Sequence, residues 1–279
     1  MTAPHPAHSS AEPLVLVTRE AGVATLMLNR PAEGNAMTQP LWEALRAALA
    51  GVSADPEVRA VVITGAGAAF CAGADLARLR AFADGAVPDV PAGRPDPQVP
   101  GALDLPAGFD DRWSCLARVP KPLIAAINGP VVGSGFCLAM FCDIRLAAAE
   151  AKLSTGFARL GPIGEMALPW ILSRAVGPHV AADLLFSARF VSGEEAARIG
   201  LVNRAVPGAE LRAEAQACAA AIAREVSPAA VAVMKRQLRR GLVQDLDAAV
   251  AEYLPEMAAS FRSEDFRTRA RALLARLKG

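Results

Sequence analysis

The sequence predicts an α/β core followed by a helical C-terminal region. Up to about residue 205, apolar stretches typical of strands alternate with amphipathic stretches typical of helices, and this alternation favours an α/β fold. Beyond that point amphipathic stretches follow one another with no strand pattern between them, at residues 209–225, 228–240, 244–259 and 260–276. We therefore expect a core over residues 13–205 and a helical region over residues 206–279, after a disordered tail over residues 1–12.

The first elements of the core follow from their composition. The stretch LVLVTREAGVATLMLNRP, residues 14–31, predicts two strands joined by a turn at Glu20, Ala21 and Gly22. In residues 38–52 apolar side chains recur on one helical face, so we expect a helix that Thr38 caps. The continuous apolar run VRAVVITG then predicts a strand that is covered on both faces.

Two later stretches differ from this simple alternation. Residues 84–108 are dense in Pro, Gly and Asp and have no periodicity, so we expect a long mobile loop. Between Lys121 and Asp143 lie twenty-one uncharged residues, which is long enough to cross a bilayer. Gly, Pro, Asn and Ser interrupt this stretch, however, and predict strand, turn, strand, turn and helix in a buried core.

Composition excludes several classes of partner. The chain has 279 residues, of which 53% are hydrophobic and 20% charged, as in soluble globular enzymes. A formal net charge of +1 argues against binding to nucleic acid or to an anionic membrane surface, since both need clustered surplus Lys and Arg. The five cysteines have no disulfide or metal-site spacing, and the N-terminus lacks a secretory signal. We therefore expect reduced thiols in a cytoplasmic protein.

Histidine is scarce, and this limits the possible chemistry. His5 and His8 lie in the tail, which leaves His179 as one candidate. A His-rich zinc site is thereby excluded, and a Ser-His-Asp triad would have to use His179, which we expect instead to be a capping or surface residue. We expect no metal site. The chemistry must depend on carboxylates and backbone dipoles.

Two glycine-rich turns each bring the chain from a strand into a helix: AGAD at residues 72–75 and GSG at residues 133–135. Neither turn matches a dinucleotide fingerprint or a P-loop. The first N–H groups of a helix lack intrahelical partners, so two such turns placed together would form an oxyanion hole without any titratable side chain. The alternative is that the glycines only permit tight turns.

Four motifs, taken in order, resemble the crotonase superfamily, the enoyl-CoA hydratases and isomerases: LNRPAEGNAMT, VRAVVITGAGAAFCAGADL, KPLIAAINGPVVGSGFCLAMFCDIRLAA and FVSGEEAARIGLVNRAVP. The resemblance implies a spiral core of repeated ββα units and a C-terminal helical region used for trimerisation. It implies an acyl-CoA thioester substrate, a homotrimer or hexamer, and no cofactor, since coenzyme A is part of the substrate. The thioester carbonyl would be held by the N–H groups of Ala74 and Ser134. Further substrate-binding positions would be Gly73, Asp75, Gly133 and Phe157.

The chain departs from the hydratase pattern at two positions. Hydratases that it resembles carry two glutamates, and the matching positions here hold Cys137 and Phe157. A cysteine in an apolar helical run is usually a buried packing residue with a raised pKa, although Cys137 as a substitute acid is an alternative. Glu165 is the remaining carboxylate, at a position similar to that of the single base in Δ3,Δ2-enoyl-CoA isomerases. The alternative for Glu165 is that it merely complements a helix dipole.

These features favour an enoyl-CoA isomerase of fatty acid metabolism, with Glu165 as the catalytic residue and the double bond shifted through a thioester enolate. One alternative is an enoyl-CoA hydratase or another crotonase-type reaction. Another is a non-catalytic acyl-CoA-binding pseudoenzyme. In the family, a basic residue of the C-terminal helices can approach the 3′-phosphate of CoA, and Lys235 or Arg236 could do so here, although both could equally be structural ion-pair groups.

Overall fold

The computed structural model describes residues 12–86, 99–110, 112–165 and 167–277. The predicted tail up to residue 11 and the centre of the predicted 84–108 loop lie outside these residues. The strands are β1 (Val15–Glu20), β2 (Val23–Leu28), β3 (Ala60–Gly65), β4 (Leu123–Ile127), β5 (Val131–Val132), β6 (Ile144–Ala148), β7 (Lys152–Ser154), β8 (Val191–Ser192) and β9 (Arg204–Val206).

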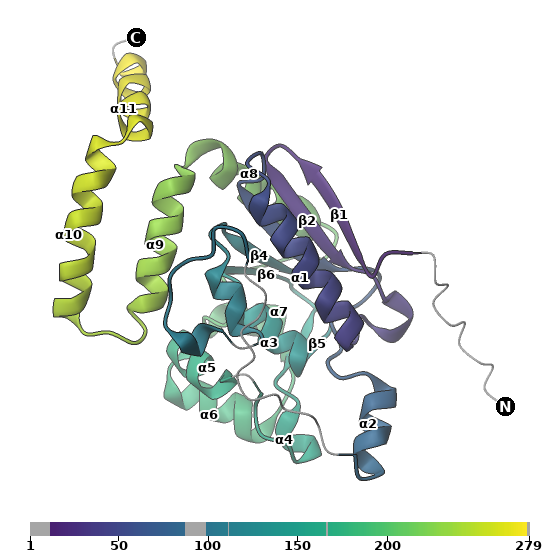
Figure 1. Cartoon of the computed structure of the whole chain (residues 1–279). Coiled ribbons are helices and arrows are strands. Elements are labelled where there is room, and N and C mark those ends of the chain that lie inside the picture. Colours follow the sequence, from purple (N-terminus) through teal and green to yellow (C-terminus); the bar gives the residue numbers. More distant parts are fainter. Residues whose placement is uncertain (1–11, 87–98, 111, 166, 278–279) are drawn as a thin grey trace.

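Six of these strands form one sheet in the order β1-β2-β3-β4-β6-β9. β1 and β2 are an antiparallel hairpin around Ala21 and Gly22, and each later neighbour pairs in parallel. Every residue of β3 and β4 is buried, as the apolar run VRAVVITG predicted for its strand. In Figure 1 the sheet lies behind the long helix α1 (Gln39–Ala54).

The helices alternate with strands and then continue alone. After α1 they are α2 (Leu76–Ala83), α3 (Ser134–Phe141), α4 (Phe157–Leu160), α5 (Leu168–Val176), α6 (Pro178–Ser187), α7 (Gly193–Arg198), α8 (Leu211–Glu225), α9 (Pro228–Arg240), α10 (Leu246–Arg262) and α11 (Glu264–Arg276). Short 3₁₀ turns are η1 (Pro31–Glu33), η2 (Ala107–Phe109) and η3 (Ser114–Arg118). As predicted, Thr38 caps α1 by accepting a hydrogen bond from the Leu41 N–H.

Successive units each place one strand in the large sheet and a second in a small sheet, ordered β5-β7-β8. β4, β5 and α3 make one such ββα unit, and β6, β7 and α4 make the next. The uncharged stretch after Lys121 therefore folds as strand, turn, strand, turn and helix, as predicted. No single helix of the described residues is long and apolar enough to span a membrane, although α8 and α9, a sharply bent pair, pass that test together by length and composition.

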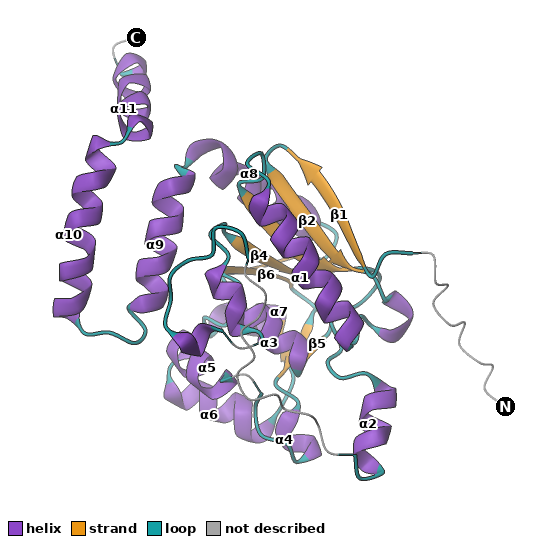
Figure 2. Ribbon diagram, in the orientation of Figure 1, coloured by secondary structure: helices purple, strands orange, loops and turns teal. Residues whose placement is uncertain are grey.

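The C-terminal helices extend away from the body (Figures 1 and 2). α8 packs on the large sheet and buries Leu211, Ala215, Ala219 and Ala223, whereas α10 and α11 bury no residue within this chain. The helix boundaries agree closely with the predicted amphipathic stretches.

One expectation is only partly met. Residues 99–108 belong to the predicted mobile loop, yet Leu103 and Leu105 are buried in a small apolar cluster with Phe109 and Ala117. The sequence did not predict this packing, since Leu103 and Leu105 stand in a stretch rich in Pro and Gly that has no helical or strand periodicity.

Candidate active site

The two glycine turns lie against each other. Cys71, just before the first turn, and Val131, just before the second turn, form an isolated parallel β-bridge. The Val132 N–H donates a 3.0 Å hydrogen bond to the Cys71 carbonyl. Gly73 has a φ of +99°, and a Cβ at this position would lie 2.8 Å from the Val132 carbonyl oxygen. Both the backbone conformation and the close approach therefore require glycine at residue 73.

The N–H groups of Ala74 and Ser134 are free to bind a ligand. Ser134 is the first residue of α3, and Ala74 comes two residues before α2. Within the described ranges neither N–H donates a hydrogen bond to the protein. Gly133, with a φ of +54°, turns the chain immediately before Ser134. The sequence therefore predicted both turns, and the fold brings them together.

Asp75 holds the first turn in place. Its carboxylate caps α2 by accepting the Ala77 N–H at 2.9 Å, and it accepts a hydrogen bond from Arg30 at 3.1 Å. The same guanidinium donates to the Ala36 carbonyl at 2.7 Å. Asp75 thus fixes the backbone next to Ala74. The role of Arg30 could not be predicted, since nothing in the local sequence marks an arginine that pairs with a residue 45 positions away.

Phe157 lies beside the second turn. It begins α4, and the end of its ring lies 3.9 Å from the position that a Cβ on Gly133 would occupy. The backbone of Gly156, in a left-handed conformation, turns the chain into this short helix. An apolar ring therefore occupies the position where hydratases that this chain resembles carry a glutamate.

Cys137 contacts the backbone of Glu165. It is fully buried one turn into α3, where its N–H donates to the Gly133 carbonyl at 3.0 Å. Its thiol donates to the Glu165 carbonyl at 3.7 Å. Burial first, and then the charge of Glu165, raise the pKa of this thiol well above its usual range. Cys137 is thus a neutral, buried residue, as its apolar surroundings predicted.

Glu165 lies in a turn just before α5. Its carbonyl also accepts the Leu168 N–H at 2.9 Å, and Ala167, a non-glycine residue, has a left-handed φ of +55°. Such strain, often found at functional sites, persists only where the surroundings fix the backbone. Glu165 is exposed, and its side chain makes no ion pair or hydrogen bond to the described residues. Within the single chain, the surroundings of this carboxylate are therefore open to solvent.

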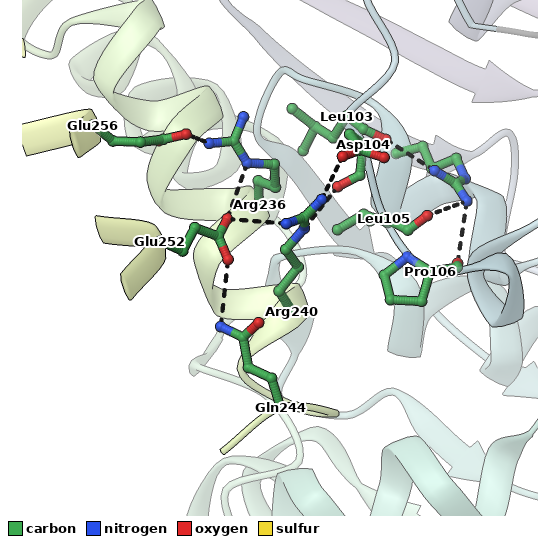
Figure 3. Close-up of polar contacts among 10 residues, drawn as sticks. Leu103, Asp104, Leu105, Pro106, Arg236, Arg240, Gln244, Glu252 and Glu256 are labelled. Atoms are coloured by element: carbon green, nitrogen blue, oxygen red, sulfur yellow. Dashed lines mark hydrogen bonds and ion pairs between the residues drawn. The ribbon is translucent and has the colours of Figure 1, made fainter. Parts of the chain in front are cut away.

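Of the two alternatives for Lys235 and Arg236, a contact with a CoA phosphate or a structural ion pair, the geometry supports the ion pair. Lys235 is buried, 2.6 Å from the Asp143 carboxylate and 3.0 Å from the Lys121 carbonyl, and Arg239 pairs with the same carboxylate at 2.9 Å. Arg236 is engaged by Glu252 and Glu256 of α10 (Figure 3). Both side chains serve the structural ion pairs that were the alternative. A buried charge needs such a partner, which local sequence does not reveal.

His179 is exposed near the start of α6, as predicted for a surface residue. Across the described part of the chain, no group of three or more His, Cys, Asp and Glu side chains could hold a metal ion. The chemistry available at the two turns is therefore that of backbone N–H groups and of Glu165.

A mostly parallel sheet leads into two adjoining helix N-termini, and the backbone of Glu165 lies against one of these helices. This arrangement defines an α/β protein suited to holding an anionic oxygen. A sequence model described as enoyl-CoA hydratase/isomerase matches residues 18–90 and 100–276. The chain belongs to this family of acyl-CoA-processing enzymes.

Individual relatives agree with this assignment. The chain is 38% identical to a Mycobacterium bovis protein named "Probable enoyl-CoA hydratase echA12" over 88% of this chain and 82% of that one. An enoyl-CoA hydratase structure from Mycobacterium smegmatis is similar with a TM-score of 0.79, 31% identity and coverage of 95% and 97%. A monofunctional enoyl-CoA isomerase from M. smegmatis is similar with a TM-score of 0.68, 31% identity and coverage of 86% and 99%. These structures confirm the predicted crotonase-like fold.

Proposed function

We propose that the protein is an enoyl-CoA isomerase that moves a double bond through a thioester enolate. The observation that carries this proposal is the contact between the main chain of Glu165 and Cys137 of α3, the helix whose N-terminus presents the free Ser134 N–H. A neutral thiol and an apolar ring stand at the two positions where hydratases have glutamates. One carboxylate suffices for a 1,3-proton shift, whereas hydration needs an acid and a base on two reacting atoms.

The reaction has two proton transfers and no net redox change. The Glu165 carboxylate removes a proton from the α-carbon of a 3-enoyl thioester, and the electron pair moves onto the carbonyl oxygen to give a dienolate. The N–H groups of Ala74 and Ser134 donate to this oxygen, and loss of one such donor typically costs about 3–4 kcal/mol of transition-state stabilisation. Glu165 then returns the proton to the γ-carbon, which leaves the 2-enoyl thioester. Gly73, Gly133 and Phe157 shape the space around the thioester.

Hydration is the second candidate, because several relatives are named hydratases. It would require a water molecule and a second acid–base group. The pKa of Cys137 is raised by burial, which makes its thiol a poor source of a proton for the reaction. A non-catalytic acyl-CoA-binding role is the third candidate.

The test is proton exchange at the α-carbon of an enoyl-CoA ester in deuterated water, followed by mass spectrometry. We expect Glu165→Gln to reduce exchange by about 10²–10⁴-fold, because the amide cannot accept the proton. Glu194→Gln is the matched control, since Glu194 is an exposed acid in the first turn of α7. It should leave exchange unchanged.

Other outcomes distinguish the candidates. Unchanged exchange in Glu165→Gln would overturn the assignment of the base. Hydration of crotonyl-CoA at a rate that does not depend on Glu165 would favour the hydratase. Tight acyl-CoA binding without turnover of enoyl-, dienoyl- or hydroxyacyl-CoA esters would favour the pseudoenzyme.

We also propose a compartment, an assembly and a substrate class for this protein. The chain acts in the cytoplasm as a homotrimer or hexamer, with an acyl-CoA thioester as substrate and no separate cofactor. Exposed apolar side chains on α10 and α11 support the assembly, since a second copy of the chain would cover them.

A further inference from the structure

Residues 103–109, which we call the strap, are held from one side by Arg118. Its guanidinium donates hydrogen bonds to strap carbonyls at 2.7–3.2 Å, those of Leu103, Leu105, Pro106 and Phe109. It also pairs with Asp110 at 2.7 Å. The guanidinium offers five N–H donors in a rigid fork, so one side chain fixes the path of the whole strap.

The strap packs against the helix that follows the Glu165 turn. Its apolar side chains are buried together, and Trp170 of α5 packs against them. The rings of Phe109 and Trp170 meet edge to face, with 6.1 Å between their centroids. α5 begins at Leu168, whose N–H binds the Glu165 carbonyl. The ring contact of Trp170 and this main-chain hydrogen bond therefore connect the strap to the backbone of Glu165.

The C-terminal helices hold the strap from the other side. Arg240 of α9 donates to the Asp104 carbonyl at 3.0 Å and also pairs with the Asp104 carboxylate. The same guanidinium pairs with Glu252 of α10 at 3.5 Å, and Glu252 also binds Arg236 and Gln244 (Figure 3). Ala232 of α9 packs against the strap's apolar side chains. The strap thus lies between the core and the helical arm.

We propose that Arg118 and Arg240 are positioning residues, which hold the strap against Trp170 and so set an apolar wall for the acyl chain beside Glu165. This inference rests on the proposed function for the location of the acyl chain. Arg118 sets the wall from within the core, and Arg240 connects it to the C-terminal helices. The occupant of the wall is the hydrocarbon end of an acyl-CoA ester.

The contacts of the two arginines differ in their sensitivity to salt. Arg118 is mostly buried and binds main-chain oxygens, so added salt barely affects its contacts. The Asp104 side chain is 85% exposed, so salt weakens its ion pair with Arg240. Acyl selectivity therefore depends on Arg118 at any ionic strength and on Arg240 chiefly at low ionic strength.

The first test measures binding of butyryl-CoA and decanoyl-CoA by calorimetry, which needs no turnover. We expect Arg118→Met to change the ratio of the two dissociation constants by about tenfold in favour of the longer ester, because a displaced wall leaves more room. Arg118→Lys should shift the ratio of the two dissociation constants less than Arg118→Met does. Phe109→Leu, which trims the wall directly, should act in the same direction and serves if Arg118→Met fails to fold.

Arg145→Met is the matched control. Arg145 also donates to main-chain carbonyls, those of Leu201 and Cys142, but has no contact with the strap among the described residues. We expect it to lower the melting temperature as Arg118→Met does and to leave the ratio unchanged. An unchanged ratio in both Arg118→Met and Phe109→Leu overturns the inference. Glu165→Gln should keep the wild-type ratio of dissociation constants. Binding therefore tests the wall, and proton exchange tests the base.

The second test addresses Arg240. At low ionic strength Asp104→Asn should lower the KM of the longer enoyl-CoA ester about two- to fivefold with little change in kcat, because a loosened strap leaves more room, and added salt should remove the difference. The charge swap Asp104→Arg with Arg240→Asp should recover part of the wild-type KM. A KM that stays at the wild-type value in Asp104→Asn, or a charge swap whose KM lies further from the wild-type value than that of both single variants, contradicts the role of Arg240.

Discussion

At the scale of single residues, Cys137 connects α3, which begins at Ser134, with the turn that contains Glu165. It lies one helical turn after Ser134 and its thiol donates to the carbonyl of Glu165. One buried helix therefore carries the proposed oxyanion donor and contacts the backbone of the proposed base. Cys71 and Cys142 are also buried, and burial raises the pKa of Cys71 to about 11 and that of Cys142 to about 12. These thiols are packing residues and weak donors at neutral pH.

The buried thiols predict a loss of stability at alkaline pH. In the unfolded chain a cysteine thiol ionises with its ordinary pKa of 9.0, whereas the pKa of Cys142 in the folded chain is about 12. The stabilising contribution is complete below pH 9.0 and is lost as pH rises toward 12, by about 1.4 kcal/mol per pH unit for each thiol. We expect Cys142→Ala to flatten this decline in urea unfolding measured across alkaline pH.

Val131→Ala is the control for that measurement. It also removes buried apolar volume but no titratable group, so it should lower the unfolding free energy equally at each pH. A slope in Cys142→Ala identical to that of the wild type would show that Cys142 ionises as readily in the folded chain.

At the scale of elements, the two turns act as a unit. Gly73→Ala adds a methyl group where φ is +99° and where the Val132 carbonyl would lie 2.8 Å away. The turn must shift and carry the Ala74 N–H with it. We expect kcat/KM for enoyl-CoA to fall by about 10²–10³-fold, the cost of one lost oxyanion donor.

Gly51→Ala is the control for the turn. Gly51 lies in α1 with nothing within 4 Å of its added Cβ. It should keep the wild-type kcat/KM and raise the unfolding free energy by about 0.5–1 kcal/mol, since alanine favours a helix. Equal activity of Gly73→Ala and Gly51→Ala would contradict the role of the Ala74 N–H.

At the scale of the whole molecule, the C-terminal helices leave apolar surface uncovered. α10 and α11 bury no side chain within the chain, and Leu254, Phe261 and Leu273 are among their exposed apolar residues. Exposed apolar surface of this kind usually marks a protein–protein interface.

We therefore expect light scattering to show a mass of three or six chains. Leu254→Lys with Leu273→Lys should shift this mass toward that of one chain, because a charge at a buried interface is costly. Phe186→Lys, on the exposed face of α6, is the control and should keep the assembly. A single-chain mass for the wild-type protein would overturn the proposed assembly.

Much of the secondary structure and both glycine turns could be predicted from local sequence. Apolar periodicity and capping residues such as Thr38 act within a few residues, so the hairpin, the buried strands and the C-terminal helices follow from local pattern. Gly73 and Gly133 mark the turns because backbone conformation is also a local property. The scarcity of histidine limited the chemistry before any contact was known.

Contacts between side chains that are distant in sequence could not be predicted and are known from the folded chain. Lys235 pairs with Asp143, Arg30 with Asp75, and Arg118 binds the strap that the sequence assigned to a mobile loop. These partners are chosen by burial, since a buried charge or carbonyl must find a complement wherever the fold provides one. Sequence pattern carries no such information, because the partners share neither a helical turn nor a strand.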